Sequence, residues 1–359
     1  MDDSKMIMST EDRKQFWDTL CTLKGEDLDS DTKILREKIK VPRLLFRFRP
    51  VTINTIEALR TNRMFLSTAN YYDDPFDTFL QIDIKYIKNN LLSFKGNEDK
   101  CTTFIEFINQ TFTGSLDEYI GNDTNSLDIN SILDLLDSNV HLEFIKYIKN
   151  LRNETKKDTW SVCFSEDGYN ESLWMKYADQ HKGFAVMYNT EEIDEKLLCG
   201  KLEKCTNCGI NNYGIELYPI YYSDEKYDAT RFAQYILLKK LENNIPVENN
   251  IPVKEILNTI YKSLGNMNWE KQKTTLIKKK CHEYDKEWRI VANANFKPPA
   301  MMEWIPSAII LGLNIGINEE NLVVTNAIQA GVGKIYRAII SELGDLDYQL
   351  VWSLENKKG

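Results

Sequence analysis

Histidine is scarce in this chain of 359 residues, with three in total. A histidine-rich metal centre is therefore not expected. Long apolar runs are also missing and the first residues lack the apolar core of a signal peptide, so we expect a cytoplasmic protein without a membrane partner. Basic charge is not in excess either. The formal net charge of −9 argues against a generic DNA coat or membrane-surface binder, but not against a local basic groove.

Cysteine does not supply a disulfide framework. The seven cysteines are odd in number and scattered, which is typical of reduced cytosolic thiols. Cys199, Cys205 and Cys208 include one C-x-x-C pair. A structural zinc needs four ligands, usually as two such pairs, so we expect no zinc at these cysteines.

The order of expected elements predicts an α+β fold with a central mixed or antiparallel sheet decorated by helices. Residues 1–40 are expected to form an N-terminal helical arm, and residues 41–359 a single domain. Within that domain, residues of about 80–158 carry apolar side chains at helical spacing and predict a helical insertion. A further helix is expected over Glu171–Gly183, with the glycine as its stop. The basic segment Lys271–Lys280 is expected to belong to another helix.

The segment Arg43–Val51 predicts a strand in which arginines alternate with aromatic residues. Because strand side chains alternate between faces, Arg47 and Arg49 share one face and Phe46 and Phe48 the other. Two neighbouring guanidinium groups suit a diphosphate, since each offers forked donors and a permanent charge. A surface face paired with carboxylates explains the same spacing, and spacing alone favours that explanation.

The sequence "DDPFD" places Asp73, Asp74 and Asp77 around one proline and one phenylalanine. It lacks the longer ligand ladder of a calcium loop, whereas a magnesium site needs only one or two carboxylates. The aspartates can equally bond their own backbone in a turn, with Phe76 as a buried plug and Asp77 as a cap for the next segment. We expect a structured loop at the rim of a site rather than a metal centre.

Two further segments carry polar groups among apolar ones. In "WSVCFSED", Cys163 lies on a small polar strand face, where a buried structural thiol is a better explanation than a nucleophile. On the expected helix, Trp174, Tyr177 and His181 form one stripe, which indicates either core packing or a ligand-stacking surface. In "KEWRI", Glu287 and Arg289 share a strand face and suit either a catalytic carboxylate or a simple Glu–Arg pair.

Taken in order, these motifs resemble the bacterial domain-of-unknown-function family 2971. The resemblance rests on "LFRFRPV", "FLSTANYYDDPFD", "WSVCFSED", "LWMKYADQHKGFAVMY", "YYSDE", "KEWRI" and "IILGLNI", and covers about Arg43–Ser341. The family usually has an asparagine where Asp73 stands here. The resemblance names a family without an activity.

A second resemblance is to ADP-ribosyltransferases, particularly toxin and phage-defence members that modify nucleic acids. It implies that Arg47 or Arg49 holds the diphosphate of NAD, that Ser67 supports the site, and that Glu287 stabilises an oxocarbenium-like ribose and orients the acceptor. Asp77 is a second candidate catalytic residue. The other candidate NAD-contacting residues are Tyr71, Tyr72, Trp174, Tyr177, His181 and Arg289.

Three hypotheses for the function remain open. The first is an NAD-consuming ADP-ribosyltransferase or NAD glycohydrolase that acts as a toxin or anti-phage effector, with nucleic acid as a possible acceptor and no metal. The second is a metal-dependent nuclease with Asp73, Asp74, Asp77 and Glu287 as ligands. The third is a non-catalytic sensor or interaction protein. If nucleic acid binds, Lys271–Lys280 is the expected phosphate-contacting segment, although a solvated helix face explains its charge as well.

Overall fold

The computed structural model describes residues 7–87, 148–192, 197–199, 217–243, 261–262, 264–292 and 300–354. Most of the expected helical insertion lies outside these residues, and so do Cys205, Cys208 and the side chain of Cys199. Of the insertion, the structure describes residues 80–87 and a helix over residues 148–158.

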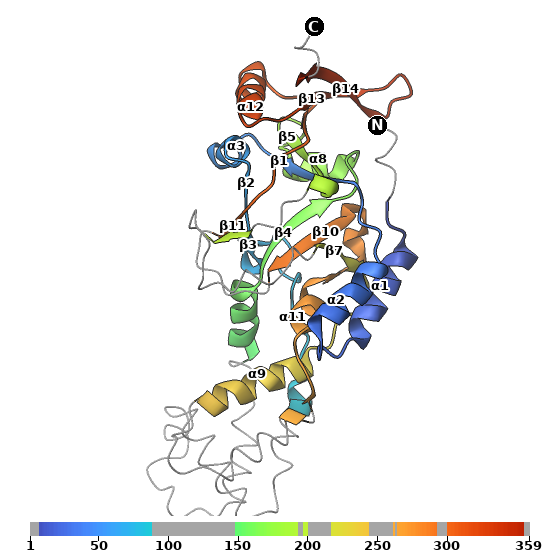
Figure 1. Ribbon diagram of the computed structural model, residues 1–359, viewed down its shortest axis with the longest axis vertical. Coiled ribbons are helices and arrows are strands. Elements are labelled where there is room, and N and C mark those ends of the chain that lie inside the picture. The colour runs from blue at the N-terminus through green and yellow to red at the C-terminus, as the bar shows by residue number, and fades with distance from the viewer. Residues whose placement is uncertain are drawn as a thin grey trace, which may run out of the picture.

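A mixed nine-stranded sheet forms the centre of the α+β fold (Figure 1). Its order is β14 (Leu346–Ser353), β13 (Lys334–Ile340), β12 (Ala308–Leu311), β5 (Phe184–Asn189), β1 (Leu44–Arg49), β4 (Trp160–Ser165), β10 (Glu287–Ala292) and β7 (Leu217–Pro219). Outside this order, β3 (Ser67–Thr68) pairs with β4. β12 and β13 are parallel, whereas β1 is antiparallel to both of its neighbours. The predicted α+β class with a mixed central sheet is confirmed.

Two smaller sheets flank the central one. The first contains β2 (Arg63–Phe65), β11 (Ala300–Glu303) and β6 (Leu197–Cys199). The second pairs β8 (Tyr221–Tyr222) in parallel with β9 (Ile277–Lys278). Part of the segment expected to form a basic helix is therefore a short strand. Helical structure in that segment is limited to α11 (Glu270–Thr275) and a 3-10 helix over Lys280–Asp285.

The described helices lie around these sheets. They include α1 (Thr10–Thr22), α2 (Leu28–Glu37), α3 (Ile53–Arg60), α8 (Glu171–Tyr177), α9 (Thr230–Asn243) and α12 (Ile317–Gln329). α1 and α2 form close to where the sequence predicts the N-terminal helices, and they lie at the β7–β10 end of the sheet (Figure 1). Phe16 of α1 stacks on Tyr218 of β7 at 5.5 Å, so α1 is packed into the core.

The helix expected over Glu171–Gly183 ends at Tyr177 instead. The next residues include three with left-handed φ angles, Asp179, Gln180 and His181. This conformation is costly for residues other than glycine. Tertiary bonds hold it, because the amide of Asn314 donates to the His181 carbonyl at 2.9 Å. The local helical pattern therefore yields to packing against the segment after β12.

A glycine brings this turn onto β1. A Cβ on Gly183 would lie 2.1 Å from the carbonyl oxygen of Arg49, so a larger residue cannot occupy this position without displacing the strand. Phe48 of β1 also meets Trp174 of α8 edge to face at 5.2 Å. Together these contacts fix the end of β1 that carries the arginine pair.

The sheet opens at that end of β1. β1 aligns with β5 over its whole length, but with β4 only where Phe46 lies opposite Ser165. At its N-terminal end, β4 pairs with β3 instead, with Ser67 opposite Ser161. A large cavity lies in the resulting gap between the end of β1 and the middle of β4.

Candidate functional site

A cavity of about 360 Å³ lies between β1, β4, β10 and the loop that comes after β3. Most of the site residues predicted from the sequence line this cavity, and two do not. Those that line it are Arg47, Arg49, Ser67, Tyr71, Tyr72, Asp77, Tyr177, Glu287 and Arg289. The lining also includes Asp73, Asp74, Cys163, Ser165, Lys176, Lys278 and Asp285. Residues from distant parts of the chain therefore meet in one hollow that carries both charge signs.

Arg47 and Arg49 form a wall of the cavity and also line a second hollow of about 270 Å³ next to α3 and β2. Among the described residues, no carboxylate forms an ion pair with either arginine. Arg47 lies over the Phe164 ring at 5.6 Å, and its Nε is buried without a hydrogen-bond partner. Burial lowers the pKa of Arg47. The carboxylate pairing that the spacing alone favours is therefore absent from the described part of the chain.

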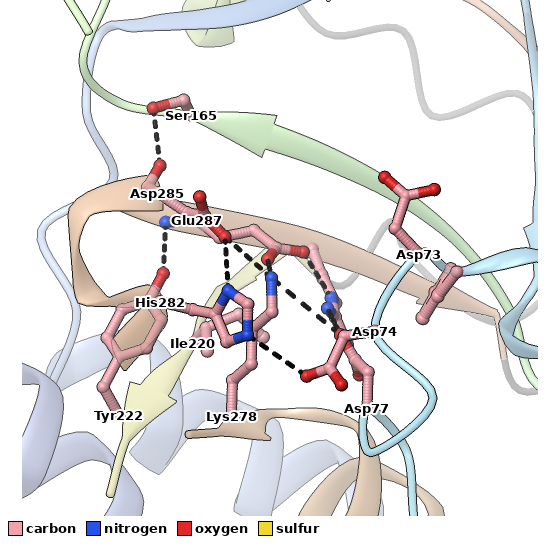
Figure 2. Close-up of polar contacts among 12 residues, drawn as sticks. Asp73, Asp74, Asp77, Ser165, Ile220, Tyr222, Lys278, His282, Asp285 and Glu287 are labelled. Carbon is pink, nitrogen blue, oxygen red and sulfur yellow. Dashed lines mark hydrogen bonds and ion pairs between the residues drawn. The ribbon is translucent and has the colours of Figure 1, made fainter. Parts of the chain in front are cut away.

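A buried charge network forms another wall of the cavity (Figure 2). Arg289 is 1% exposed and binds Asp77 with two donors at 2.8 and 2.6 Å, and its Nε donates to Glu287 at 2.6 Å. Lys278 donates to Glu287 at 3.0 Å and to Asp285 at 2.8 Å. Three carboxylates face two cations, so one negative charge is left over in this group.

The network shifts the pKa values of Glu287, Lys278 and Arg289. Burial opposes the charge of Glu287, but Arg289 and Lys278 outweigh it and hold the pKa of this carboxyl well below its usual range. Burial likewise opposes the charge of Lys278, yet the surrounding carboxylates, Glu287 above all, raise its pKa. The same balance raises the pKa of Arg289. Glu287 is therefore a fixed anion and a weak proton acceptor.

A second set of buried bonds holds the backbone of β10. Arg13 of α1 is 2% exposed, donates to the Glu287 carbonyl at 3.0 Å, and pairs with Glu166 at 2.7 Å. The hydroxyl of Tyr222 accepts the Glu287 amide at 2.7 Å, and the indole of Trp288 donates to Glu166 at 2.7 Å. The N-terminal helix therefore supports the strand that carries the candidate catalytic carboxylate.

The "DDPFD" loop is a structured turn, as the sequence predicts. Asp74 accepts the Phe76 amide at 2.8 Å through its side chain, and its carbonyl accepts the Asp77 amide at 3.1 Å. Two details of the prediction are wrong. Phe76 is 51% exposed rather than a buried plug, and Asp77 binds Arg289 rather than capping the next segment.

The aromatic residues of the site divide into two groups. Tyr72 lies between Ser161, to which its hydroxyl is bonded, and Arg289, whose guanidinium is 4.9 Å from the ring centre. Tyr71 is 78% exposed at the rim, and the ring of Tyr177 lies 4.7 Å from the Lys176 ammonium. All three tyrosines keep a surface on the cavity.

Trp174 and His181 are the two corrections among the predicted site residues. Trp174 is fully buried, stacks on His181 at 5.3 Å, and donates its indole N–H to Tyr348 at 3.1 Å. Neither residue lines the cavity. The stripe predicted for them is not formed on one helix, because His181 lies in the turn after α8, and both residues pack in the core behind the site.

Sequence reasoning missed Lys278, Asp285 and His282. Asp285 ends the 3-10 helix over Lys280–Asp285 and is separated from β10 by Lys286, which has a left-handed φ angle, so the alternation of "EWR" does not extend to it. Lys278 is hidden within a generally basic stretch of sequence. His282 lies between two acids, with Nε2 3.3 Å from Asp74 and Nδ1 3.9 Å from Asp285 (Figure 2). No local pattern marks this contact.

The basic segment Lys271–Lys280 is largely turned inward. Lys271 donates to the Asp158 carbonyl at 3.1 Å, Lys273 is buried against Glu270, and Lys278 belongs to the charge network. The solvated helix face that would explain this charge is therefore not formed, and phosphate contact by the segment stays a prediction.

Cys163 lines the cavity as a neutral thiol. Burial is the largest of the effects that raise its pKa to about 12, and the neighbouring Glu287 carboxylate adds to it. A thiol with such a pKa holds its proton at neutral pH and is a poor nucleophile. The sequence-based preference for a structural thiol agrees with this position.

Comparison with known proteins gives one match to a family model and no activity. Residues 173–290 match the family model described as protein of unknown function (DUF2971). This match confirms the family resemblance seen in the sequence, and it spans Tyr177, Lys278, Glu287 and Arg289 of the cavity. No curated protein and no solved structure matches the chain. Among the described helices, none combines the length and apolar character needed to cross a bilayer.

Proposed function

We propose that the cavity binds NAD and that the protein is an NAD-consuming ADP-ribosyltransferase or NAD glycohydrolase. The observation that carries this proposal is the meeting of Arg47, Arg49, Ser67 and Glu287 in one cavity. Glu287 lies far from the other three in the sequence. One wall offers cations without carboxylate partners among the described residues, and the other offers a fixed anion.

The arginine wall suits the diphosphate. A buried guanidinium donor without a partner is unfavourable, and a phosphate oxygen would supply the missing acceptor at Arg47. Arg49 lies two residues along the same strand and lines the same two hollows. A dinucleotide held at its diphosphate by these arginines would have a hollow available on each side.

The anionic wall suits cleavage of the nicotinamide–ribose bond. When that bond breaks, its electron pair goes to the nicotinamide nitrogen and positive charge develops on the ribose. A carboxylate already fixed in place stabilises this charge without reorganisation. The low pKa of Glu287 excludes it as an efficient base, so its proposed roles are electrostatic stabilisation and orientation of the acceptor. The acceptor oxygen bonds to the ribose carbon and releases its proton to solvent.

An ADP-ribosyltransferase-like fold is part of the proposal. Its support is the placement of an arginine on β1, a serine on β3 and a glutamate on β10 around one cavity. The biological setting that we propose is a toxin or anti-phage effector, because either NAD depletion or modification of a nucleic acid disables a cell.

The geometry gives less support to a metal-dependent nuclease. Asp77 and Glu287 are bonded to Arg289 and Lys278, so a divalent ion would have to displace buried cations. Asp73 points away from this group and lies 3.9 Å from Lys176 (Figure 2). Within the described residues, no three potential ligands are placed to hold a metal.

The test is nicotinamide release from NAD by the purified protein, alone and with RNA, DNA or protein acceptors. We expect release that persists in EDTA. Cleavage of nucleic acid that EDTA abolishes would instead support the nuclease. Absence of NAD binding by calorimetry, together with no turnover in any mixture, would leave the non-catalytic sensor as the better account.

A further inference from the structure

A cationic, partly aromatic surface lies on the outer side of the loop that lines the cavity. The ammonium of Lys279 is 4.1 Å from the Phe76 ring centre, and that of Lys226 is 4.9 Å from it. Lys226 is also 4.5 Å from the ring centre of Phe79, over which Arg152 lies at 4.4 Å. We call this the Phe76 surface, formed by Phe76, Phe79, Arg152, Lys156, Lys226 and Lys279.

The cations of the Phe76 surface have no ion-pair partner among the described residues, although Asp74 lies close enough to act on the pKa values of Lys156 and Lys226. Lys156 donates to the Pro75 carbonyl at 2.6 Å and Arg152 to a backbone carbonyl at 2.9 Å. No carboxylate in the described part of the chain forms an ion pair with any of the four cations. Burial, and then repulsion from Lys279, lowers the pKa of Lys226, while Asp74 opposes the shift. Four cations thus gather at one place on a chain with a net charge of −9.

The surface and the cavity share one loop. Asp74 and Asp77 line the cavity, while Phe76 between them is 51% exposed. Lys279 is the next residue after Lys278, which belongs to the buried charge network. A molecule bound to the Phe76 surface would therefore lie beside the cavity.

We propose that the Phe76 surface binds single-stranded nucleic acid and presents it to the cavity as the acceptor. Grouped cations bind phosphates, and an exposed aromatic ring stacks on an unpaired base. A duplex hides its base faces, so the ring favours a single strand. The role as acceptor rests on the proposed NAD chemistry, whereas the binding does not.

The experiment is fluorescence anisotropy with labelled single-stranded RNA and DNA oligonucleotides, without NAD, across a salt series. The test variant is Lys226→Gln/Lys279→Gln. The matched control is Lys33→Gln/Lys38→Gln, which removes two exposed lysines of the α2 region. Thermal unfolding checks that both variants fold.

We expect the test variant to bind about tenfold more weakly at physiological salt, because two phosphate contacts are lost. The magnitude of the slope of log affinity against log salt should decrease by about 1.4, because each of the two lost phosphate contacts accounts for about 0.7 on a single strand. Phe76→Ala should weaken binding about fivefold or more through lost stacking. The control should match the wild type.

Equal affinity of the test variant and the control overturns the inference. The inference is also overturned if the protein binds anionic phospholipid vesicles through Lys226 and Lys279 and does not bind oligonucleotides. Failure here is separable from failure of the proposed function. NAD turnover without oligonucleotide binding would refute only the inference about the Phe76 surface. Oligonucleotide binding without NAD turnover would refute only the proposed NAD chemistry.

Discussion

Replacing Arg289 by methionine tests whether the charge network is a single buried unit. Arg289 is 1% exposed and makes three bonds of 2.6 to 2.8 Å to Asp77 and Glu287. Its removal leaves three buried carboxylates, Asp77, Asp285 and Glu287, with Lys278 as the remaining cation. Loss of one partner from a buried pair costs about 3–5 kcal/mol. We expect a decrease of this size in the free energy of unfolding, measured by urea denaturation.

The control for this substitution is Arg60→Met. Arg60 also binds a carboxylate with two donors, at 2.9 and 2.7 Å from Glu57, but both side chains are about half exposed. Exposed pairs contribute little to stability, so the control should be nearly neutral. The double variant Arg289→Met/Asp77→Leu should recover part of the loss, because one orphaned carboxylate is gone. If Arg289→Met cost no more than Arg60→Met, the reasoning about the buried network would be refuted.

Three further predictions concern the cavity. The pKa of Glu287 is lowered by folding, so its stabilising effect is present above its ordinary value of 4.5 and is lost as pH falls below it. As the pH decreases, the free energy of unfolding measured with urea should fall less for Glu287→Gln than for the wild type. Equal decreases would contradict the lowered pKa of Glu287. Iodoacetamide followed by peptide mass spectrometry should label exposed Cys281 much faster than Cys163, and similar rates would contradict the raised thiol pKa. Arg49→Gln should weaken ADP-ribose binding about tenfold or more in calorimetry, while Arg60→Gln keeps wild-type affinity.

The strands of the site could be predicted because their signals are local. Alternation in "LFRFR" and "EWRI" depends on a period of two, and both segments form strands with the expected bounds to within a few residues. The turn at Asp74 results from side-chain bonds to the nearby backbone. In each case the deciding contacts lie within a few positions along the chain.

The pairings inside the cavity could not be predicted in this way. Asp77 and Arg289 are separated by 212 positions, and no local spacing indicates which carboxylate meets which cation. The sequence pattern misplaces the end of α8 for a similar reason, since Asn314 holds the left-handed turn after this helix. Trp174 resembles a ligand-stacking residue in the sequence because an aromatic stripe has the same period in a core as beside a pocket.

Nicotinamide release by Glu287→Gln, compared with wild type and with Glu11→Gln, tests the central claim most directly. Glu11 is exposed on α1 and does not line the cavity, so its variant controls for loss of a carboxylate elsewhere. Removal of one preorganised electrostatic group costs about 100-fold or more in rate. We predict such a loss for Glu287→Gln, in protein shown to be folded by circular dichroism, and wild-type release for Glu11→Gln. Equal release by the two variants would contradict the assignment of Glu287 as the carboxylate that stabilises cleavage of NAD.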